Sequence, residues 1–107
     1  MAVETLFFRP VDADNLPIAG IAADTAVEIL QESTLKGFDF SDSSFKDVPD
    51  LVTRFATLTE DPNRSGLYYH AQNTTGWPLG KYLVLASFSG LCPPAAGTIR
   101  VKGGAVL

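Results

Sequence analysis

The chain contains one cysteine, Cys92, one histidine, His70, and no run of lysine or arginine. A single cysteine excludes an internal disulfide, and one Cys with one His supplies too few ligands for a zinc site, which takes three or four. The 8 Lys+Arg and 12 Asp+Glu give a net charge of −4. Because clustered positive charge is missing, the sequence predicts no binding to nucleic acid and none to an anionic membrane.

Long hydrophobic runs and catalytic motifs are missing as well. The first residues show no basic start followed by an apolar run, so we predict no secretory signal. The longest nearly uncharged stretch, 82–99, is interrupted by glycine and proline and is too short to cross a bilayer as a helix. The sequence has no G-x-S-x-G, no phosphate-binding glycine loop and no H-E-x-x-H. We therefore predict a protein that is folded inside the cell, is not an enzyme and carries no cofactor or metal.

Turn residues and apolar residues are abundant in the sequence and are distributed evenly along it. The 9 Gly and 7 Pro are spread along all 107 residues, and 46% of the residues are hydrophobic. This amount of apolar material is typical of one packed core, and the dense punctuation is typical of short strands joined by turns. We expect one all-β domain over 1–107, with 103–107 as an apolar C-terminal tail.

Alternating apolar and polar residues locate the strands, because successive side chains of a strand point to opposite faces. Turn residues cluster at 12–15 and at 61–66. The expected sandwich has about seven short antiparallel strands, including 3–11, 25–31, 67–72, 81–89 and 98–102, and a hairpin through Phe38, Phe40 and Phe45.

The segment 48–60 fits two structures. Thr53, Thr57 and Thr59 favour a strand, because β-branched residues suit extended backbone. Apolar residues at helical spacing after Pro49 favour one short helix near 49–58. The strand is the preferred prediction and the helix remains the alternative.

Three sequence stretches resemble a known fold. Gly66-Leu67-Tyr68-Tyr69, followed by Gly80-Lys81-Tyr82-Leu83-Val84, resembles the paired tyrosine strands near the end of immunoglobulin-like β-sandwiches. The stretch Asn15–Gly20, which leads to the expected strand with Val27 and Ile29, resembles the opening of the same folds, so the resemblance covers about residues 10–102. Such domains occur in bacterial surface proteins, in carbohydrate-active enzymes and in tailed-phage virion proteins of the head, neck, baseplate or fibre. The sequence departs from antibody domains, since the cysteine pair is missing and Trp77 lies in a loop.

The resemblance implies a function in which the surface of the domain binds other protein subunits. The strand 81–89 is apolar on both faces, so we predict an interface with other subunits. The candidate interface residues are Leu83, Leu85, Phe88, Val106 and Leu107. The predicted function is that of a structural assembly protein, a small virion component whose partners are copies of itself and other virion proteins.

The alternative function is that of a carbohydrate-binding or adhesin-type module. Trp77, Tyr68 and Tyr69 are the candidates for an aromatic platform under a glycan. Against this, a tyrosine in a Gly-x-Tyr strand usually belongs to the core or corner of a sandwich, with its hydroxyl bonded to backbone.

The remaining polar candidates have simpler interpretations. The carboxylates Asp39, Asp42, Asp47 and Asp50 lack the spacing and the glycine of a calcium loop, so we expect solvated turn residues. His70 is expected to point to solvent or an interface. Cys92, followed by two prolines, is expected to be a small packing residue in a turn.

Overall fold

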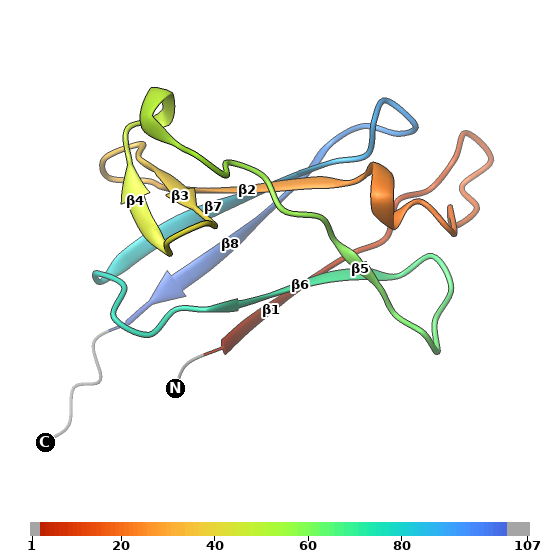
Figure 1. Ribbon diagram of the computed structural model, residues 1–107. Coiled ribbons are helices and arrows are strands. Elements are labelled where there is room, and N and C mark those ends of the chain that lie inside the picture. Colours follow the sequence, from red (N-terminus) through yellow and green to blue (C-terminus); the bar gives the residue numbers. More distant parts are fainter. Residues whose placement is uncertain (1–2, 103–107) are drawn as a thin grey trace, which may run out of the picture.

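The structure, a computed structural model that describes residues 3–102, has two antiparallel β-sheets facing each other across one core (Figure 1). The smaller sheet has three strands in the order β1-β6-β5, which span Val3–Phe8, Tyr68–Asn73 and Thr59–Glu60. The larger sheet has five strands in the order β4-β3-β2-β7-β8, which span Ser44–Lys46, Gly37–Asp39, Ala26–Gln31, Gly80–Ser87 and Ala95–Val101. The predicted all-β sandwich is confirmed, and the described residues form eight strands, β1 to β8.

The strand order is that of a variable-type immunoglobulin sandwich without its first strand. The sheet β1-β6-β5 corresponds to strands B, E and D, and β8-β7-β2-β3-β4 corresponds to G, F, C, C′ and C″. Near the start of β7, the Tyr82 hydroxyl donates a hydrogen bond of 2.6 Å to the carbonyl of Pro78. A tyrosine at this corner makes the same type of backbone contact in immunoglobulin domains. The missing first strand leaves the outer edge of β1 unpaired within residues 3–102.

The core lies between the two sheets and follows the predicted alternation. Val27 and Ile29 of β2 are fully buried, as are Tyr82 and Val84 of β7. Each large apolar side chain removed from water in this way contributes about 1.5–3 kcal/mol. The other buried core residues are Phe8, Ile21, Phe38, Leu58, Tyr68, Ala86, Phe88 and Ile99.

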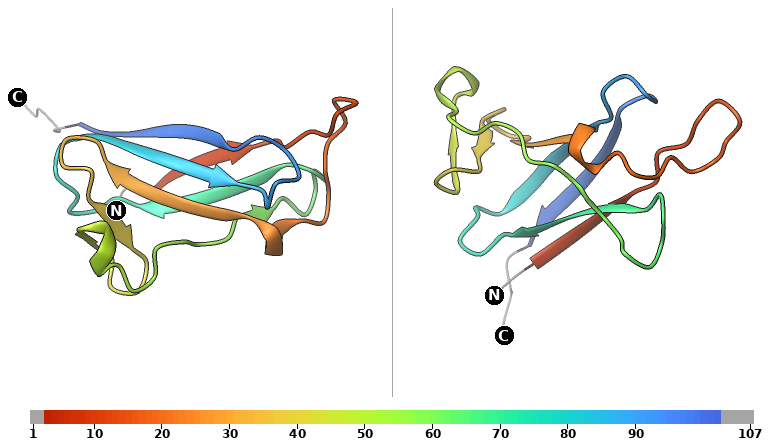
Figure 2. Two further views of the ribbon diagram at one scale, coloured as in Figure 1. Left: turned by 90° about the horizontal axis from the view of Figure 1, so that it is seen from above. Right: turned by 45° about the vertical axis from the view of Figure 1, so that its right-hand side comes forward.

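The edges of the two sheets approach each other on one flank, where β1 passes close to β8 (Figure 2). Gly97 of β8 makes this approach possible. A Cβ added at Gly97 would lie 3.0 Å from Cδ2 of Leu6 in β1, which is tighter than ordinary side-chain packing. The two longest free edges of the molecule are therefore neighbours.

Residues 48–60 differ from both sequence predictions. Val48–Asp50 forms a single 3-10 turn, and Ala56 makes an isolated antiparallel bridge to Val27. Only Thr59–Glu60 forms a strand. The preferred prediction of a strand over 48–60 is wrong for most of this segment, and the alternative of a helix near 49–58 is wrong as well.

Most of residues 48–60 forms no strand because a side chain accepts hydrogen bonds from two backbone N–H groups of this segment. The Asp39 carboxylate accepts hydrogen bonds from the N–H groups of Val52 and Thr53, at 2.9 and 3.1 Å. Pro49 has no N–H to donate, which weakens a ladder further. Because these donors are committed to one carboxylate, the chain passes the end of β3, where the N–H of Phe40 donates to the Thr53 carbonyl, without forming a regular strand.

One more short 3-10 helix, Ala22–Asp24, precedes β2. Within residues 3–102, the structure has no helix of the length and apolarity needed to span a membrane.

Candidate functional site

The outer face of the five-stranded sheet carries the two leucines predicted to form an interface. Leu83 lies between Leu30 of β2 and Thr98 of β8 in the strand register. Leu85 lies between Glu28 and Ala96 in the next row of this face. Leu30, Leu83 and Leu85 are only partly buried, because the core is on the opposite side of the sheet. We call Leu30, Leu83, Leu85, Ala96 and Thr98 the outer patch.

Ion pairs border the outer patch. Arg54 Nε lies 2.7 Å from Glu28 Oε2, and Lys81 Nζ lies 3.3 Å from Glu32 Oε2. Each pair has at least one partner that is more than a third exposed, and surface pairs of this kind contribute little to stability, typically about 1 kcal/mol or less. An apolar centre with charged groups at its margin is the usual composition of a protein–protein interface. The predicted residues Leu83 and Leu85 are therefore available for contacts with another protein.

Phe88 does not belong to this surface. Its side chain is only 2% exposed and packs in the core, so the prediction of Phe88 as an interface residue is wrong. The alternation of β7 explains the difference, since Phe88 continues the inward row of Tyr82, Val84 and Ala86. Val106 and Leu107, and the tail 103–107 to which they belong, lie outside the described residues.

The three aromatic residues predicted as a glycan platform have separate environments. Tyr68 is completely buried, so its assignment to an exposed platform is wrong. Its hydroxyl donates to the carbonyl of Ile18 at 2.7 Å and accepts from the N–H of Ile21 at 3.2 Å. This is the backbone-bonded core tyrosine that the Gly-x-Tyr pattern favours.

Trp77 is half-buried in an aromatic cluster at the end of the sandwich. Its ring centroid lies 4.7 Å from Tyr82, 5.0 Å from Phe45 and 5.2 Å from Phe38. Burial raises the pKa of the Tyr82 phenol, which is part of this cluster. The Trp77 ring therefore packs against protein rings and closes the core beside the β3–β4 hairpin.

Tyr69 faces outward on the smaller sheet. Its ring centroid lies 6.1 Å from that of Phe7, and the two ring planes are tilted by 51°. Rings at this angle do not form one flat surface, so the described residues give no observation that favours a glycan over a protein partner.

Asp39 has a structural role that the sequence interpretation missed. Its side chain is completely buried, so the expectation of a solvated turn carboxylate is wrong at this position. It accepts hydrogen bonds from the N–H and Oγ of Ser41, at 2.9 and 2.6 Å, and lies 2.9 Å from Lys46 Nζ. The hydrogen bonds from Ser41, the Val52 N–H and Lys46 hold the pKa of Asp39 far below its usual value, although burial opposes the shift.

The neighbouring carboxylates share the same lysine or face water. Lys46 Nζ lies 2.7 Å from Asp42, which lowers the pKa of Asp42 and raises the pKa of Lys46. Asp47 and Asp50 are exposed, as expected. Within residues 3–102, no group of three or more His, Cys, Asp and Glu side chains is arranged to hold a metal ion.

His70 points inward and not to solvent, which corrects that expectation. It is partly buried, and Nε2 lies 2.9 Å from Oε1 of Gln72. Its ring packs edge-on against Phe40, with 5.8 Å between centroids. The described partners of His70 are therefore an amide and an aromatic ring, and neither one sets up acid–base chemistry.

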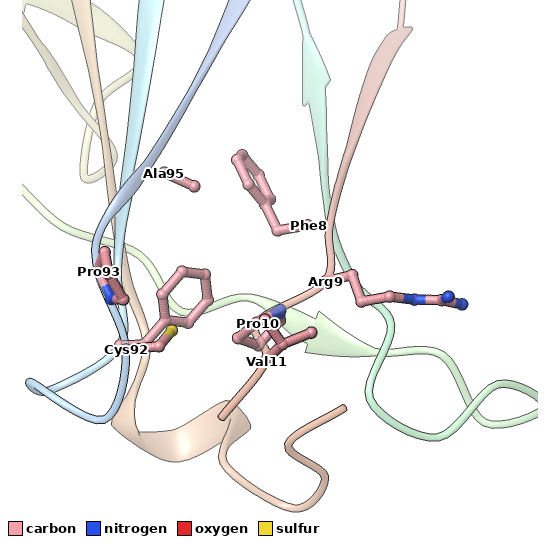
Figure 3. A pocket seen from close by; sticks show the side chains of 8 residues that line it. Phe8, Arg9, Pro10, Val11, Cys92, Pro93 and Ala95 are labelled. Atoms are coloured by element: carbon pink, nitrogen blue, oxygen red, sulfur yellow. The ribbon is translucent and has the colours of Figure 1, made fainter. Parts of the chain in front are cut away.

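Cys92 is a partly buried packing residue, as expected. It lines a pocket of about 140 Å³ between the end of β1 and the start of β8, together with Phe8, Pro10 and Ala95 (Figure 3). Arg9 points away from this pocket. The pocket is small and apolar, and the comparisons with known proteins do not assign a ligand to it.

Those comparisons gave no match to any protein-family model, curated protein or solved structure. The strand order supports the sandwich fold, whereas the resemblance to virion domains rests on the sequence pattern alone.

Proposed function

We propose that the chain is a structural protein that associates with other copies of itself through the outer patch. The observation that carries this proposal is the position of Leu83 and Leu85, on the side of β7 that faces away from the core. Three leucines left partly exposed in adjacent rows are costly in water and gain stability when another protein covers them. Within this role, the sequence resemblance is the support for a further proposal, that the chain belongs to a tailed-phage virion.

The mechanism of this function is association and needs no chemical step. The outer patch supplies the apolar centre, and Glu28–Arg54 and Lys81–Glu32 supply the charged margin. A small group of central side chains usually dominates the free energy of such contacts. Leu83 and Leu85 fit that description because β7 lies inside the sheet, with strands on both sides.

The first test replaces both leucines with lysine, Leu83→Lys with Leu85→Lys. We expect the mass in solution, measured by light scattering over a range of concentrations, to shift toward the monomer. The dissociation constant should rise at least about tenfold, as expected when residues at the centre of an interface are lost. The fold should persist, because both side chains already face water in part.

Phe7→Lys is the matched control. Phe7 is also an exposed apolar strand residue, but it lies on the outer face of the other sheet. Its replacement should leave the mass unchanged. A parent chain that is monomeric at every concentration would contradict the proposal, and so would self-association that Phe7→Lys abolishes and the double leucine variant leaves intact.

The placement in a virion has its own test. Mass spectrometry of purified phage particles should detect the chain at a fixed ratio to the other structural proteins. Its absence from the particles would overturn the placement without affecting the self-association measured in solution.

A further inference from the structure

The exposed ring of Phe55 extends the outer face of the larger sheet beyond β2. Ala56 makes an antiparallel bridge with Val27 of β2, and this register places Phe55 beside Glu28. Val27 is buried in the core, so by alternation Phe55 and Glu28 are on the outer face. Half of the surface of Phe55 is exposed. One row across this face is therefore Phe55, Glu28, Leu85 and Ala96.

Phe55 is held in place within the single chain. Arg54 Cζ lies 5.0 Å from the centroid of the Phe55 ring, and Arg54 Nε lies 2.7 Å from Glu28 Oε2. A guanidinium over an aromatic face attracts the ring and restricts it. An aromatic side chain that is exposed but already ordered loses little conformational entropy on binding, and aromatic residues are enriched in interfaces. Phe55 therefore has the properties of an anchor for a protein partner.

The charges of the outer face are concentrated in one row. The Glu32 N–H donates to the Lys81 carbonyl at 3.0 Å, which continues the register of β2 and β7 by one pair. This row is therefore Glu32, Lys81 and Arg100. Glu32 and Lys81 are adjacent near the centre of the sheet, whereas Arg100, with Lys102 two positions on, lies on the edge strand β8. Glu28, the other charged residue on this side of β2, is paired with Arg54.

We propose that two copies of the chain pair through the outer patch about a two-fold axis that runs along the strands, between β2 and β7. The proposal rests on the proposed function, since it takes the outer patch as the contact between copies. This axis lays β2 of each copy over β7 of the other, so Leu30 faces Leu83. It also places each Phe55 ring on Ala96, the smallest side chain of its row. Each contact occurs twice, as in any isologous interface.

The charged row supports this position of the axis. Glu32 of each copy faces Lys81 of the other, so the two ion pairs form a square in which the signs alternate. An axis along β7 itself would place Lys81 against Lys81, which is repulsive. An axis across the strands would place Lys81 against Ser87 and separate Phe55 from Ala96. Because one axis matches the ring, the leucines and the charges together, a second copy is the partner that fits.

The first measurement compares Phe55→Ala with Leu91→Ala by light scattering over a range of concentrations. Leu91 is also a large exposed apolar residue, but it lies in the turn after β7, outside the outer patch. We expect Phe55→Ala to raise the dissociation constant of the dimer at least about tenfold, because an anchor is lost on both sides. Leu91→Ala should associate like the parent chain.

The second measurement locates the axis by cross-linking. Phe55→Cys and Ala96→Cys are made separately with Cys92→Ala, so that each variant has one thiol. Facing residues of two packed sheets are about 10 Å apart, which a short bismaleimide spans. We expect a cross-linked dimer in an equimolar mixture of the two variants. Neither variant should cross-link alone, because three strand spacings, about 14 Å across the sheet, separate the two copies of either residue.

Three results would overturn this arrangement: a Phe55→Ala chain that associates like the parent, a mixture of cysteine variants that associates without cross-linking, or an Ala96→Cys chain that cross-links to itself. The third result is the one that an axis across the strands gives. If Leu83→Lys with Leu85→Lys still abolishes association in these cases, the proposed function stands and only the axis is wrong. A parent chain that is monomeric at every concentration overturns both.

Discussion

At the scale of single residues, two buried polar groups connect segments that are distant in sequence. Tyr68 joins β6 to the loop at residues 18–21 through its hydroxyl, and Asp39 joins β3 to residues 52–53 through its carboxylate. Both side chains are fully buried, and no buried polar side-chain atom within residues 3–102 lacks a partner. Removing either group leaves the backbone groups that it satisfied without a partner.

Tyr68→Phe is expected to destabilise the fold without changing its shape. The change leaves the Ile21 N–H and the Ile18 carbonyl unpaired in the interior, which costs about 1–3 kcal/mol. Thermal unfolding followed by circular dichroism should show a lower midpoint. Tyr69→Phe is the control, because the Tyr69 hydroxyl makes no hydrogen bond within residues 3–102, and its midpoint should stay within about 0.5 kcal/mol of the parent. Equal effects of the two variants would contradict the role of the Tyr68 hydroxyl.

The buried carboxylate of Asp39 is expected to make the folded protein less stable in acid. Its pKa is lower in the folded chain than in the unfolded chain, because Ser41, Val52 and Lys46 donate hydrogen bonds to the carboxylate. A lowered pKa contributes stability that is complete above the unfolded value of about 3.9 and is lost as the pH falls below it. The midpoint of thermal unfolding should therefore fall steeply below about pH 4.

The matching variant is Asp39→Asn, which should lower the unfolding midpoint by roughly 10 °C at neutral pH and flatten its dependence on pH in the acid range. Asp50→Asn removes the same charge at an exposed position and serves as control. An Asp39→Asn chain with the parent's acid profile would show that other carboxylates set the profile.

At the scale of elements, the sequence correctly predicted the features that depend on residues close to each other in the chain. The turns at 12–15 and 61–66 are present, with Asp12 and Asp61 accepting the N–H of the residue two positions on. The hairpin through Phe38 and Phe45 is present, and their rings lie 5.3 Å apart. The inward rows of β2 and β7 also follow from alternation.

What the sequence did not predict depends on contacts between distant residues. The conformation of 48–60 depends on Asp39, which accepts hydrogen bonds from donors 13 and 14 positions away. The outward position of Leu83 and Leu85 follows from alternation, and so does the inward position of Phe88, but alternation alone does not say which of the two faces the core covers. An open concavity is lined by residues 11–13 and 90–93, and only the fold brings these two loops together.

Two loops meet at Gly66, and this contact is a testable element of the fold. Gly66 has φ +83°, and an added Cβ would lie 2.6 Å from Cβ of Pro17. Gly76 has the same φ of +83°, with nothing within 4 Å of an added Cβ. Both alanine variants incur the left-handed strain of about 1–2 kcal/mol, and only Gly66→Ala incurs the clash with a rigid ring.

We therefore expect Gly66→Ala to lower the free energy of unfolding by about 1–3 kcal/mol more than Gly76→Ala. Chemical denaturation of the two variants measures this difference directly. Equal losses would mean that the loop at residue 17 moves away from Gly66 at no cost.

At the scale of the whole molecule, the position of the outer patch sets the direction in which copies would associate. The patch lies on one face of the five-stranded sheet, and the core lies on the opposite face. Association of two copies through this one patch therefore pairs them face to face.

The free edge of β1 gives the molecule an aggregation hazard. An unpaired strand presents N–H and C=O groups to any other strand, and Val3–Phe8 has one charged residue, Glu4, in six. Charged residues on such edges act as gatekeepers against amyloid-like stacking. Glu4→Val should therefore shorten the lag before thioflavin-binding fibrils form on prolonged incubation, whereas Glu32→Val, which removes the same charge from a turn, should not. Within residues 3–102, the unpaired edge of β1 thus leaves resistance to fibril formation dependent on one glutamate.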